Sequence, residues 1–248
     1  MNQLYNSDYT DPLIVQLYDL LNPFSKDSQF YLELASNPSV STVLDIGCGT
    51  GVIAIEISKK QKKVVGIDPS EAMINIAKSK YSSKNLQWVV GDISNTPLYK
   101  FDCIFMAGHA SQVFLTETMW TSVLMHSYFS LNPGGILAFE TLNPILKPWE
   151  QWKPSFSKRT IFHQHLGQVD VWYDIISFKE KVAYYNTYYD FKTNNRLITT
   201  KGAKIFREKE EIISNLSKIG FRIKVIYGNW DLSLDTKEGK ELIFIATK

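Results

Sequence analysis

The chain has 248 residues, of which 44% are hydrophobic and 21% charged, and its formal net charge at pH 7 is +2. This composition is typical of a globular protein with a sizeable core, and so small a charge gives no basic field that would attract nucleic acid. The longest apolar run is far shorter than the roughly 20 residues that span a membrane. Residues 1–5 lack the basic and apolar regions of a signal peptide.

Two helices are expected before the first strand. In the segment 11–21, Asp11 suits the N-cap position and Pro12 suits the first turn of a helix. Residues 27–36 predict a second helix. Together these segments predict a helical cap over residues 1–38.

Residues 43–51 read Val-Leu-Asp-Ile-Gly-Cys-Gly-Thr-Gly, so an apolar run ends in an acid and alternate glycines follow. The pattern predicts a strand, a tight turn and a helix start, because glycine adopts backbone angles closed to other residues and leaves room for a ligand. The spacing is not the G-x-G-x-x-G of dinucleotide sites, and Asp45 would repel a pyrophosphate. A ligand with an ammonium or hydroxyl group, near the weakly positive helix start, is expected instead.

Between residues 40 and 140, strand-like apolar runs alternate with helical patterns. The runs cover residues 43–46, 64–68, 86–90, 101–106 and 131–140. Before the last run, apolar residues recur with a period of about 3.6, as on one face of a helix. These residues are Trp120, Val123, Leu124, Tyr128 and Leu131. The alternation predicts a parallel sheet covered by helices on both faces.

After residue 147 the alternation stops, and strand-like runs follow one another without a helix between them. They cover residues 169–178, 182–191 and 197–206, with a turn at 194–195. These runs predict an antiparallel insertion. A helix over 208–219, ended by Gly220, then leads to strands over 221–227 and 241–246, which should form an antiparallel hairpin at the sheet edge.

The motifs and their order resemble those of class I, Rossmann-like S-adenosylmethionine (SAM)-dependent methyltransferases of the small-molecule type. Asp-Ile-Gly-Cys-Gly-Thr-Gly is similar to the family's first motif, and Asn-Pro-Gly-Gly at residues 132–135 to the turn into its fifth strand. The similarity is strong over about residues 40–146 and extends by pattern over 208–248. It implies an α/β fold with a doubly wound, mostly parallel, seven-stranded sheet, a helical N-terminal cap and an antiparallel β insertion.

The same resemblance implies one domain over residues 1–248. Its SAM-binding core would comprise residues 39–146 and 208–248, and residues 147–207 would form an antiparallel lid. SAM would be the cofactor and S-adenosylhomocysteine the product, bound where the strands end at their carboxyl side.

The resemblance also implies individual roles. Asp45 and the glycine turn would hold the methionine part of SAM, and Asp68 would accept hydrogen bonds from both ribose hydroxyls. Met73 would pack against the adenine, Asp92 would accept a hydrogen bond from the adenine amino group, and Tyr18 would close over SAM. The full set is Tyr18, Asp45, Gly47, Cys48, Gly49, Gly51, Asp68, Pro69, Met73, Gly91, Asp92, Ile93 and Ala107.

Several of these residues have a plainer structural alternative. Asp45 could cap the glycine turn, and Asp68 could be the N-cap of the following helix. Met73 could be an ordinary core residue, and Asp92 an exposed loop residue. The sequence leaves these alternatives open.

The family has no fixed catalytic residue, because the methyl donor is already activated and the protein mainly aligns the reacting atoms. His109 follows the fourth strand and is the best-placed group to accept a proton, although a hydrogen-bonded loop histidine is an equal alternative. A dense aromatic set combines sheet packing with candidates for an acceptor pocket. Its members are Trp149, Trp152, Phe156, Trp172, Tyr173, Tyr184, Tyr185, Tyr188 and Tyr189.

No metal site is expected. The two cysteines, Cys48 and Cys103, give neither a disulfide framework nor metal-binding spacing. His163 and His165 have no acidic or thiol partners at metal spacing, so they are expected at the surface or in a pocket. This cysteine usage favours a cytoplasmic protein.

These observations predict a methyltransferase that modifies a nitrogen or oxygen atom of a small molecule. Two alternatives stay open: a non-catalytic SAM-binding partner subunit, and an RNA methyltransferase that uses cations of the insertion, namely Lys158, Arg159, Lys201 and Lys204. An NAD enzyme is disfavoured by the glycine spacing, and DNA-base methylation by the lack of Asn-Pro-Pro-Tyr or Asp-Pro-Pro-Tyr after the fourth strand. We expect no membrane or nucleic-acid partner, and either a monomer or a homodimer.

Overall fold

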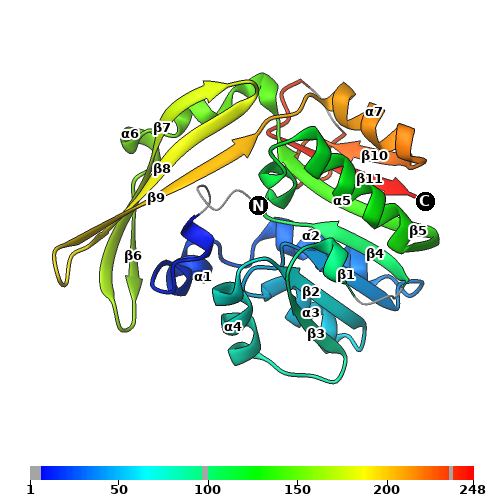
Figure 1. Ribbon diagram of the computed structural model, residues 1–248, viewed down its shortest axis with the longest axis horizontal. Coiled ribbons are helices and arrows are strands. Elements are labelled where there is room, and N and C mark those ends of the chain that lie inside the picture. Colours follow the sequence, from blue (N-terminus) through cyan, green and yellow to red (C-terminus); the bar gives the residue numbers. More distant parts are fainter. Residues whose placement is uncertain (1–6, 97–99, 235–236) are drawn as a thin grey trace.

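The computed structural model describes residues 7–96, 100–234 and 237–248, so the signal-peptide prediction for residues 1–5 lies outside the described residues. A central sheet is covered by helices, and a smaller antiparallel sheet projects from one end of it (Figure 1). No helix within the described ranges has the length and apolar character needed to cross a membrane.

In the described part of the chain, the central sheet has seven strands in the order β10-β11-β5-β4-β1-β2-β3. The strands are β1 (Thr42–Ile46), β2 (Lys63–Asp68), β3 (Leu86–Val90), β4 (Phe101–Met106), β5 (Leu131–Leu142), β10 (Arg222–Tyr227) and β11 (Glu241–Thr247). Strand β11 runs antiparallel to β5 and β10, and the other neighbouring pairs are parallel. The predicted doubly wound, mostly parallel sheet and its edge hairpin are confirmed.

Helices cover both faces of this sheet. They are α2 (Lys26–Ser36), α3 (Val52–Lys59), α4 (Glu71–Lys80), α5 (Glu117–Ser130) and α7 (Lys209–Ile219). Successive strand residues point to opposite faces, so Leu44 packs in the core with α5 and α7, while Val43 packs with Tyr31 of α2. Helix α4 packs against β2 and β3.

The predicted helix faces and ends agree with this packing. On α5 the buried residues include Trp120, Val123 and Leu124, whereas Leu131 is already the first residue of β5. Helix α7 ends at Gly220, whose φ of 113° lies in the left-handed region that glycine adopts without strain. The predicted helix over 27–36 is confirmed as α2, which begins one residue earlier.

The insertion forms a second sheet, here called the lid sheet, with four antiparallel strands within the described residues 159–205. They are β6 (Arg159–His163), β7 (Gly167–Lys179), β8 (Val182–Phe191) and β9 (Arg196–Ile205). The last three match the predicted runs, and a turn at residues 192–195 joins β8 to β9. The prediction missed β6, because a run of five residues gives only a short alternating pattern.

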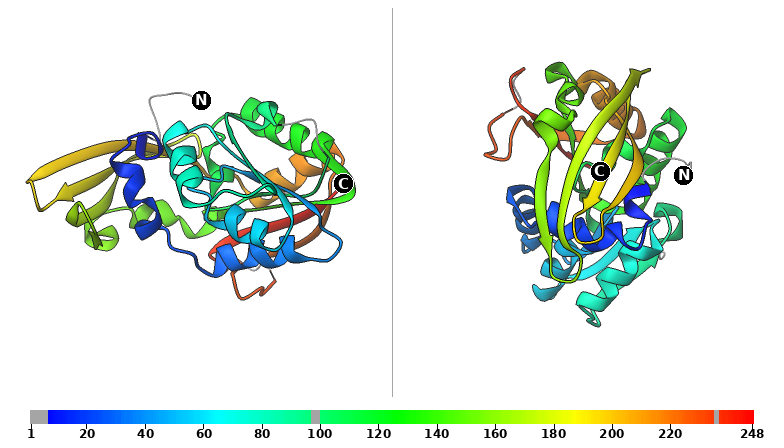
Figure 2. Two further views of the ribbon diagram at one scale, coloured as in Figure 1. Left: turned by 90° about the horizontal axis from the view of Figure 1, so that it is seen from below. Right: turned by 90° about the vertical axis from the view of Figure 1, so that its left-hand side faces the viewer.

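The N-terminal segment packs under the lid sheet, beside α4 (Figures 1 and 2). The predicted single helix over 11–21 is wrong in its extent. The structure has a 3-10 turn at Ile14–Leu17 followed by one α-helical turn, α1, at Tyr18–Leu21, and a separate 3-10 turn at Ser7–Tyr9.

Burial explains this difference, whereas capping follows the prediction. The Asp11 carboxylate accepts hydrogen bonds from the backbone N–H groups of Leu13 (2.8 Å) and Ile14 (3.2 Å), as the side chain of an N-cap residue does. The apolar residues of the segment then pack on the lid sheet instead of on the central core. They are Ile14, Leu17 and Leu21, in contact with a cluster that includes Val169, Val171 and Phe191. Tertiary contacts thus override the helical period.

Candidate functional site

The glycine turn joins β1 to α3 with a backbone that only glycine adopts freely. Gly47 and Gly51 have φ angles of 75° and 79°, in the left-handed region. A Cβ on Gly51 would lie 2.3 Å from the ring of Trp88, and one on Gly47 would lie 3.0 Å from Ala110. The turn is therefore fixed both by its dihedral angles and by close packing.

A cavity of ≈ 610 Å³ opens beside this turn, at the carboxyl ends of the parallel strands. We call it the glycine-turn cavity. Most of the predicted cofactor residues line it: Tyr18, Gly47, Gly49, Asp68, Pro69, Met73, Gly91, Asp92, Ile93 and Ala107. Gly51 does not, because it lies under Trp88 at the start of α3.

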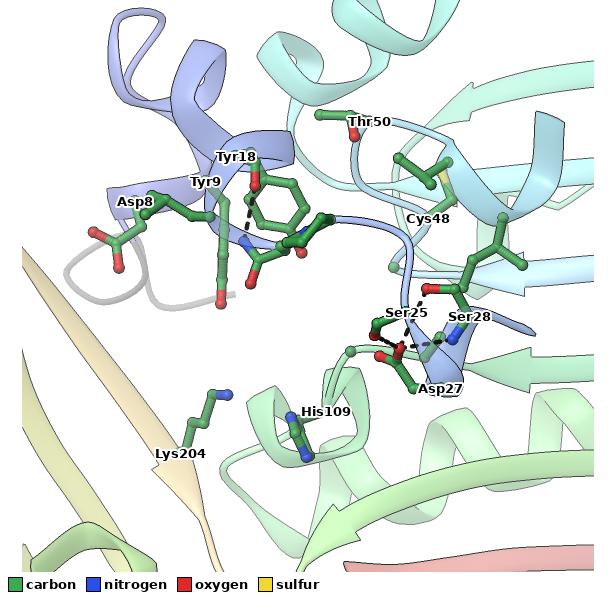
Figure 3. A pocket seen from close by; sticks show the side chains of 18 of the residues that line it. Asp8, Tyr9, Tyr18, Ser25, Asp27, Ser28, Cys48, Thr50, His109 and Lys204 are labelled. Atoms are coloured by element: carbon green, nitrogen blue, oxygen red, sulfur yellow. Dashed lines mark hydrogen bonds between the residues drawn. The ribbon is translucent and has the colours of Figure 1, made fainter. Parts of the chain in front are cut away.

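A second cavity, of ≈ 510 Å³, lies between the central sheet and the lid sheet (Figure 3). We call it the lid cavity. The predicted cofactor residues Asp45 and Cys48 line this cavity rather than the first. The two cavities share part of their walls, namely Tyr9, Tyr18, Gly47, Ala107 and Gly108.

Asp68 closes the glycine turn and faces the glycine-turn cavity. One carboxylate oxygen accepts the N–H of Gly49 at 2.9 Å and the other accepts the N–H of Ser70 at 2.8 Å. The N-cap of α4 is Ser70, whose hydroxyl accepts the N–H of Met73 at 3.1 Å, so the N-cap alternative for Asp68 is wrong. Burial raises the pKa of Asp68, and the two backbone hydrogen bonds oppose that rise. Each oxygen keeps a lone pair for a further donor.

Asp45 is 2% exposed and, within the described residues, its carboxylate accepts no hydrogen bond. The cap alternative therefore fails, because the turn's N–H groups bond to the carbonyl of Ile67 and to Asp68 instead. Burial raises the pKa of Asp45 well above its ordinary value, and Asp68 and Glu140 add to the rise. A buried carboxylate without donors is unfavourable, and a cationic ligand group would relieve it.

The alternatives for the adenine residues resolve differently. Met73 is 1% exposed, so it is a core residue whose side chain also reaches the cavity wall. Asp92 is exposed, and its carboxylate accepts hydrogen bonds from the backbone and hydroxyl of Ser94, which lowers its pKa. Asp92 thus caps a short 3-10 turn at Ile93–Asn95 while it lines the cavity.

His109 lies in the lid cavity wall and is held at two points (Figure 3). Its backbone has a φ of 61°, rare for a residue with a side chain, and its N–H donates to Oε1 of Glu140 at 2.5 Å. Its ring Nε2 lies 3.0 Å from Oε2 of Glu241. Glu140 is fully buried and also accepts a hydrogen bond from the hydroxyl of Tyr31.

The prediction missed both of these glutamates. Burial raises the pKa of Glu140, and the nearby His109 and the hydroxyl of Tyr31 oppose the rise. The sequence does contain a signal for them. Glu140 lies in one apolar strand and Glu241 begins another, and a glutamate is almost never fully buried without a partner. The sequence does not reveal that Glu140 and Glu241 both have His109 as a partner.

The lid sheet supplies the opposite wall of the lid cavity. Some of the predicted aromatic residues line it, namely Trp152, Tyr173, Tyr185 and Tyr189. Others pack elsewhere: Trp149 stacks on Phe178, and Trp172 stacks on Tyr188. The aromatic residues thus divide between sheet packing and cavity lining, and their role in an acceptor pocket stays a prediction.

Asp8 and Tyr9 enter the lid cavity from the N-terminal segment, and the sequence gives no sign of this. Asp8 accepts hydrogen bonds from the hydroxyls of Thr187 (3.0 Å) and Thr200, which fasten the segment to β8 and β9. Burial raises the pKa of Asp8 to about 6, against hydrogen bonds from Thr187 and Tyr189 that lower it.

The remaining candidates lie outside both cavities or have other partners. His163 and His165 lie at the turn between β6 and β7 and line neither cavity. Within the described residues, no cluster of three or more His, Cys, Asp or Glu side chains could hold a metal ion. Among the cations considered for RNA binding, Lys158 lies 3.2 Å from Asp170 and Lys204 lines the lid cavity, so they do not share an open face.

Comparison with known proteins agrees with this geometry. Residues 43–135 match the family model described as a methyltransferase domain. The chain is 31% identical over 119 residues to the demethylmenaquinone methyltransferase of Lactococcus lactis, which covers 44% of the chain and 46% of that protein. It is 34% identical over 104 residues to a carboxy-S-adenosyl-L-methionine synthase of Wolinella succinogenes, covering 39% and 42%. The chain thus spans less than half the length of both relatives.

Solved structures share the whole fold. A SAM-dependent methyltransferase from Clostridium acetobutylicum has a TM-score of 0.75 at 17% identity, over 95% of this chain and 97% of that one. An amino pentose methyltransferase from Micromonospora echinaspora has a TM-score of 0.69 at 17% identity, over 93% of this chain and 96% of that one. A sugar N-methyltransferase from Streptoalloteichus has a TM-score of 0.73 at 15% identity, over 93% of this chain and 92% of that one. Residues 43–135 of the chain thus match a methyltransferase domain, and the chain shares its whole fold with SAM-dependent methyltransferases of known structure.

Proposed function

We propose that the protein transfers the methyl group of SAM to a nitrogen or oxygen atom of a small-molecule acceptor. The observation that carries this proposal is that the glycine-turn cavity and the lid cavity share the wall formed by Tyr9, Tyr18, Gly47, Ala107 and Gly108. A donor bound in one cavity and an acceptor bound in the other would meet along these shared residues, and bringing the reacting atoms together is the main requirement of the reaction.

The residues of the glycine-turn cavity, together with Asp45 in the wall of the adjoining lid cavity, fit SAM. Asp45, buried and without a hydrogen-bond donor in the described part of the chain, would take the ammonium of the methionine part. Asp68 would accept from the ribose hydroxyls with its remaining lone pairs, while Met73 and Ile93 would contact the adenine. SAM would supply the methyl group on a positively charged sulfur.

The chain's own contribution at the acceptor would be to position it and to take its proton. Glu241 and Glu140 fix the ring and the backbone of His109, so the imidazole is oriented in the cavity wall before any acceptor arrives. A positioned imidazole that accepts a proton typically contributes about 10²-fold or more to a rate. His109 is therefore our candidate base, with Glu241 as the residue that positions it.

The lid, residues 147–207, would choose the acceptor, whereas the core, residues 39–146 and 208–248, would bind SAM. The names of similar proteins include an amino pentose and a sugar N-methyltransferase as well as a demethylmenaquinone methyltransferase, so proteins similar to this chain act on different acceptors. The aromatic and hydroxyl groups of Trp152, Tyr173 and Tyr185 suit an acceptor with both apolar and polar faces. The free, buried cysteines fit the cytoplasmic location predicted from the sequence.

Calorimetry with SAM, S-adenosylhomocysteine and NAD tests the cofactor, and release of S-adenosylhomocysteine over a panel of amines, alcohols and phenols tests the transfer. Binding of the first two ligands and turnover of at least one acceptor by the isolated protein are expected. Tight binding of NAD without SAM would overturn the proposal. SAM binding with turnover only after addition of a second protein would favour the partner-subunit alternative, and salt-dependent binding of RNA would favour the RNA methyltransferase.

A further inference from the structure

The lid cavity contains a lysine that points into it from the lid sheet. Lys204 lies on β9, on the face of the strand that it shares with Thr200 and Gly202. Figure 3 shows its ammonium directed into the cavity, between the N-terminal segment and His109. The side chain is partly buried and lines the cavity wall.

Within the described ranges, the Lys204 ammonium makes no ion pair and no hydrogen bond. Glu140, Glu241 and Asp8 act on its charge from a longer distance. Each of these carboxylates already has a nearer partner: Glu140 and Glu241 hold His109, and Asp8 holds two threonine hydroxyls. The three N–H donors of Lys204 therefore point to a space that none of the described residues fills.

This arrangement is unfavourable for the charged form of Lys204. Burial lowers the pKa of Lys204 below its ordinary value, against the pull of the distant carboxylates. An ammonium that leaves water without a direct acceptor loses solvation that nothing nearby replaces. A hydrogen-bond acceptor atom on a bound ligand would replace the lost solvation.

The surroundings of Lys204 add a hydroxyl donor and aromatic walls. Tyr185 on β8 pairs with Gly202, where a Cβ would come within 2.2 Å of the tyrosine ring, so the ring lies over Gly202, two residues before Lys204 on the same face of β9. Trp152 packs edge-on against Tyr185 with their centroids 4.9 Å apart. An oxyanion here would meet one ammonium and one phenol as donors, with aromatic rings for its apolar portion.

We propose that Lys204 and Tyr185 bind an anionic group of the methyl acceptor, a carboxylate or a phosphate, and so select acceptors that carry such a group away from the reacting atom. The proposal rests on the proposed function, since it takes the lid cavity as the acceptor site. Asp8 and Asp45 line the same cavity and would repel an anion, and Asp8 also acts on the charge of Lys204, so the anion must contact the ammonium directly to outweigh this repulsion.

Benzoate and phenyl phosphate serve as probes, with benzamide as the uncharged control, each titrated into the protein saturated with S-adenosylhomocysteine. At least one anion should bind at millimolar concentration or better, and benzamide should bind far more weakly. Lys204→Met should weaken anion binding by about tenfold to a hundredfold, as expected for the loss of a charged hydrogen bond. Tyr185→Phe should weaken it by a few-fold, and Lys204→Arg should retain it.

Lys201→Met is the matched control, because Lys201 is exposed on the opposite face of the same strand. Its binding of the probes should equal that of the parent. The relative affinity of benzoate and phenyl phosphate decides between a carboxylate and a phosphate. Equal binding of anions by Lys204→Met and the parent, equal binding of benzamide and benzoate, or no anion binding at all would overturn the proposal.

The same titrations separate this proposal from the methyltransferase proposal. S-adenosylhomocysteine should bind Lys204→Met as it binds the parent, and failure of the parent to bind it would contradict the methyltransferase proposal itself. The stability of the protein without ligand gives an independent readout, because removal of a partly buried charge that has no direct partner should not destabilise the fold. Lys204→Met should therefore melt at or above the parent's temperature, and a fall of several degrees would show that Lys204 already has a favourable partner.

Discussion

The two cavities meet at Tyr18, yet they are built in different ways. The glycine-turn cavity is lined mainly by loops that directly follow β1, β2, β3 and β4, each within a few residues of a strand end. The walls of the lid cavity come from the N-terminal segment, the loop after β4 and the lid sheet, which are far apart in the sequence. One site depends on backbone geometry, and the other depends on which side chains the fold brings together.

Gly51→Ala tests how strictly the backbone-built cavity depends on its turn. The φ of 79° strains any L-residue, and the added Cβ would lie 2.3 Å from Trp88. Strain of about 1–2 kcal/mol and overpacking of about 1–3 kcal/mol should lower the free energy of unfolding by about 2–5 kcal/mol. Chemical denaturation measures this loss, and the variant should also bind S-adenosylhomocysteine poorly.

Gly134→Ala separates the two causes. Gly134 has a similar φ of 77°, but a Cβ there would meet nothing within 4 Å. Its free energy of unfolding should fall only by the cost of the strained backbone, about 1–2 kcal/mol. If both variants lose the same stability, the packing of Trp88 over the turn contributes nothing, and the contrast between the two cavities is weaker than the geometry indicates.

The lid cavity should respond through chemistry rather than through folding. His109→Gln should lower turnover by about 10²-fold while S-adenosylhomocysteine binds as before, because His109 lies outside the glycine-turn cavity. Glu241→Gln should lower turnover in the same direction but less, since the ring would keep a neutral hydrogen-bond partner at Nε2. Initial rates with an identified acceptor measure both effects.

The pH dependence of the same rates distinguishes a base from a structural residue. If His109 takes the acceptor's proton, the pH dependence of turnover in the parent should be altered in His109→Gln. His126→Gln, an exposed change on α5, is the control and should keep the parent's profile. A flat profile in the parent, with normal turnover in His109→Gln, would leave alignment of the reactants as the whole mechanism.

Asp68→Ala sharpens the comparison from the cofactor side. It removes the acceptor of two backbone N–H groups and of the expected ribose hydroxyls. The loss of hydrogen bonds to a charged group costs roughly 1.5–3 kcal/mol, so calorimetry should show SAM binding weakened about tenfold to a hundredfold. Asp231→Ala, exposed in the loop after β10, should bind as the parent does. Parent-like binding by Asp68→Ala would assign Asp68 to the turn alone.

The contrast also explains what the sequence could and could not predict. The strands, the glycine turn and the positions of Asp68, Met73 and Asp92 follow from local patterns, because each residue lies next to the strand that places it. The roles of Asp8, Glu140 and Glu241 depend on contacts across 31 to 192 residues, as in the bonds of Glu140 to His109 and of Asp8 to Thr200. No local period reports such contacts. The predicted extent of the helix over 11–21 is wrong for the same reason, because the apolar residues of this segment pack on the lid sheet.

Asp8 gives the smallest expected effect, and one that belongs to the lid cavity. Burial raises its pKa from 3.8 to about 6 in the folded protein, so the folded state binds this proton more tightly than the unfolded chain does. Its contribution to stability is therefore complete below pH 3.8 and is lost as the pH rises through about 6. Asp8→Asn cannot titrate, so its stability relative to the parent should increase by about 1 kcal/mol between about pH 5 and pH 7.5.

Denaturant titrations of both proteins at the two pH values measure this change, and the comparison needs no separate control because each protein is its own reference across pH. The amide also loses part of the hydrogen bonding to Thr187 and Thr200, which shifts Asp8→Asn by an amount that does not vary with pH. The pH trend, rather than the absolute stability, therefore reports the buried carboxylate. A relative stability that falls instead with pH would mean that the charged form of Asp8 is favoured in the fold, and that the lid cavity already compensates its own charges.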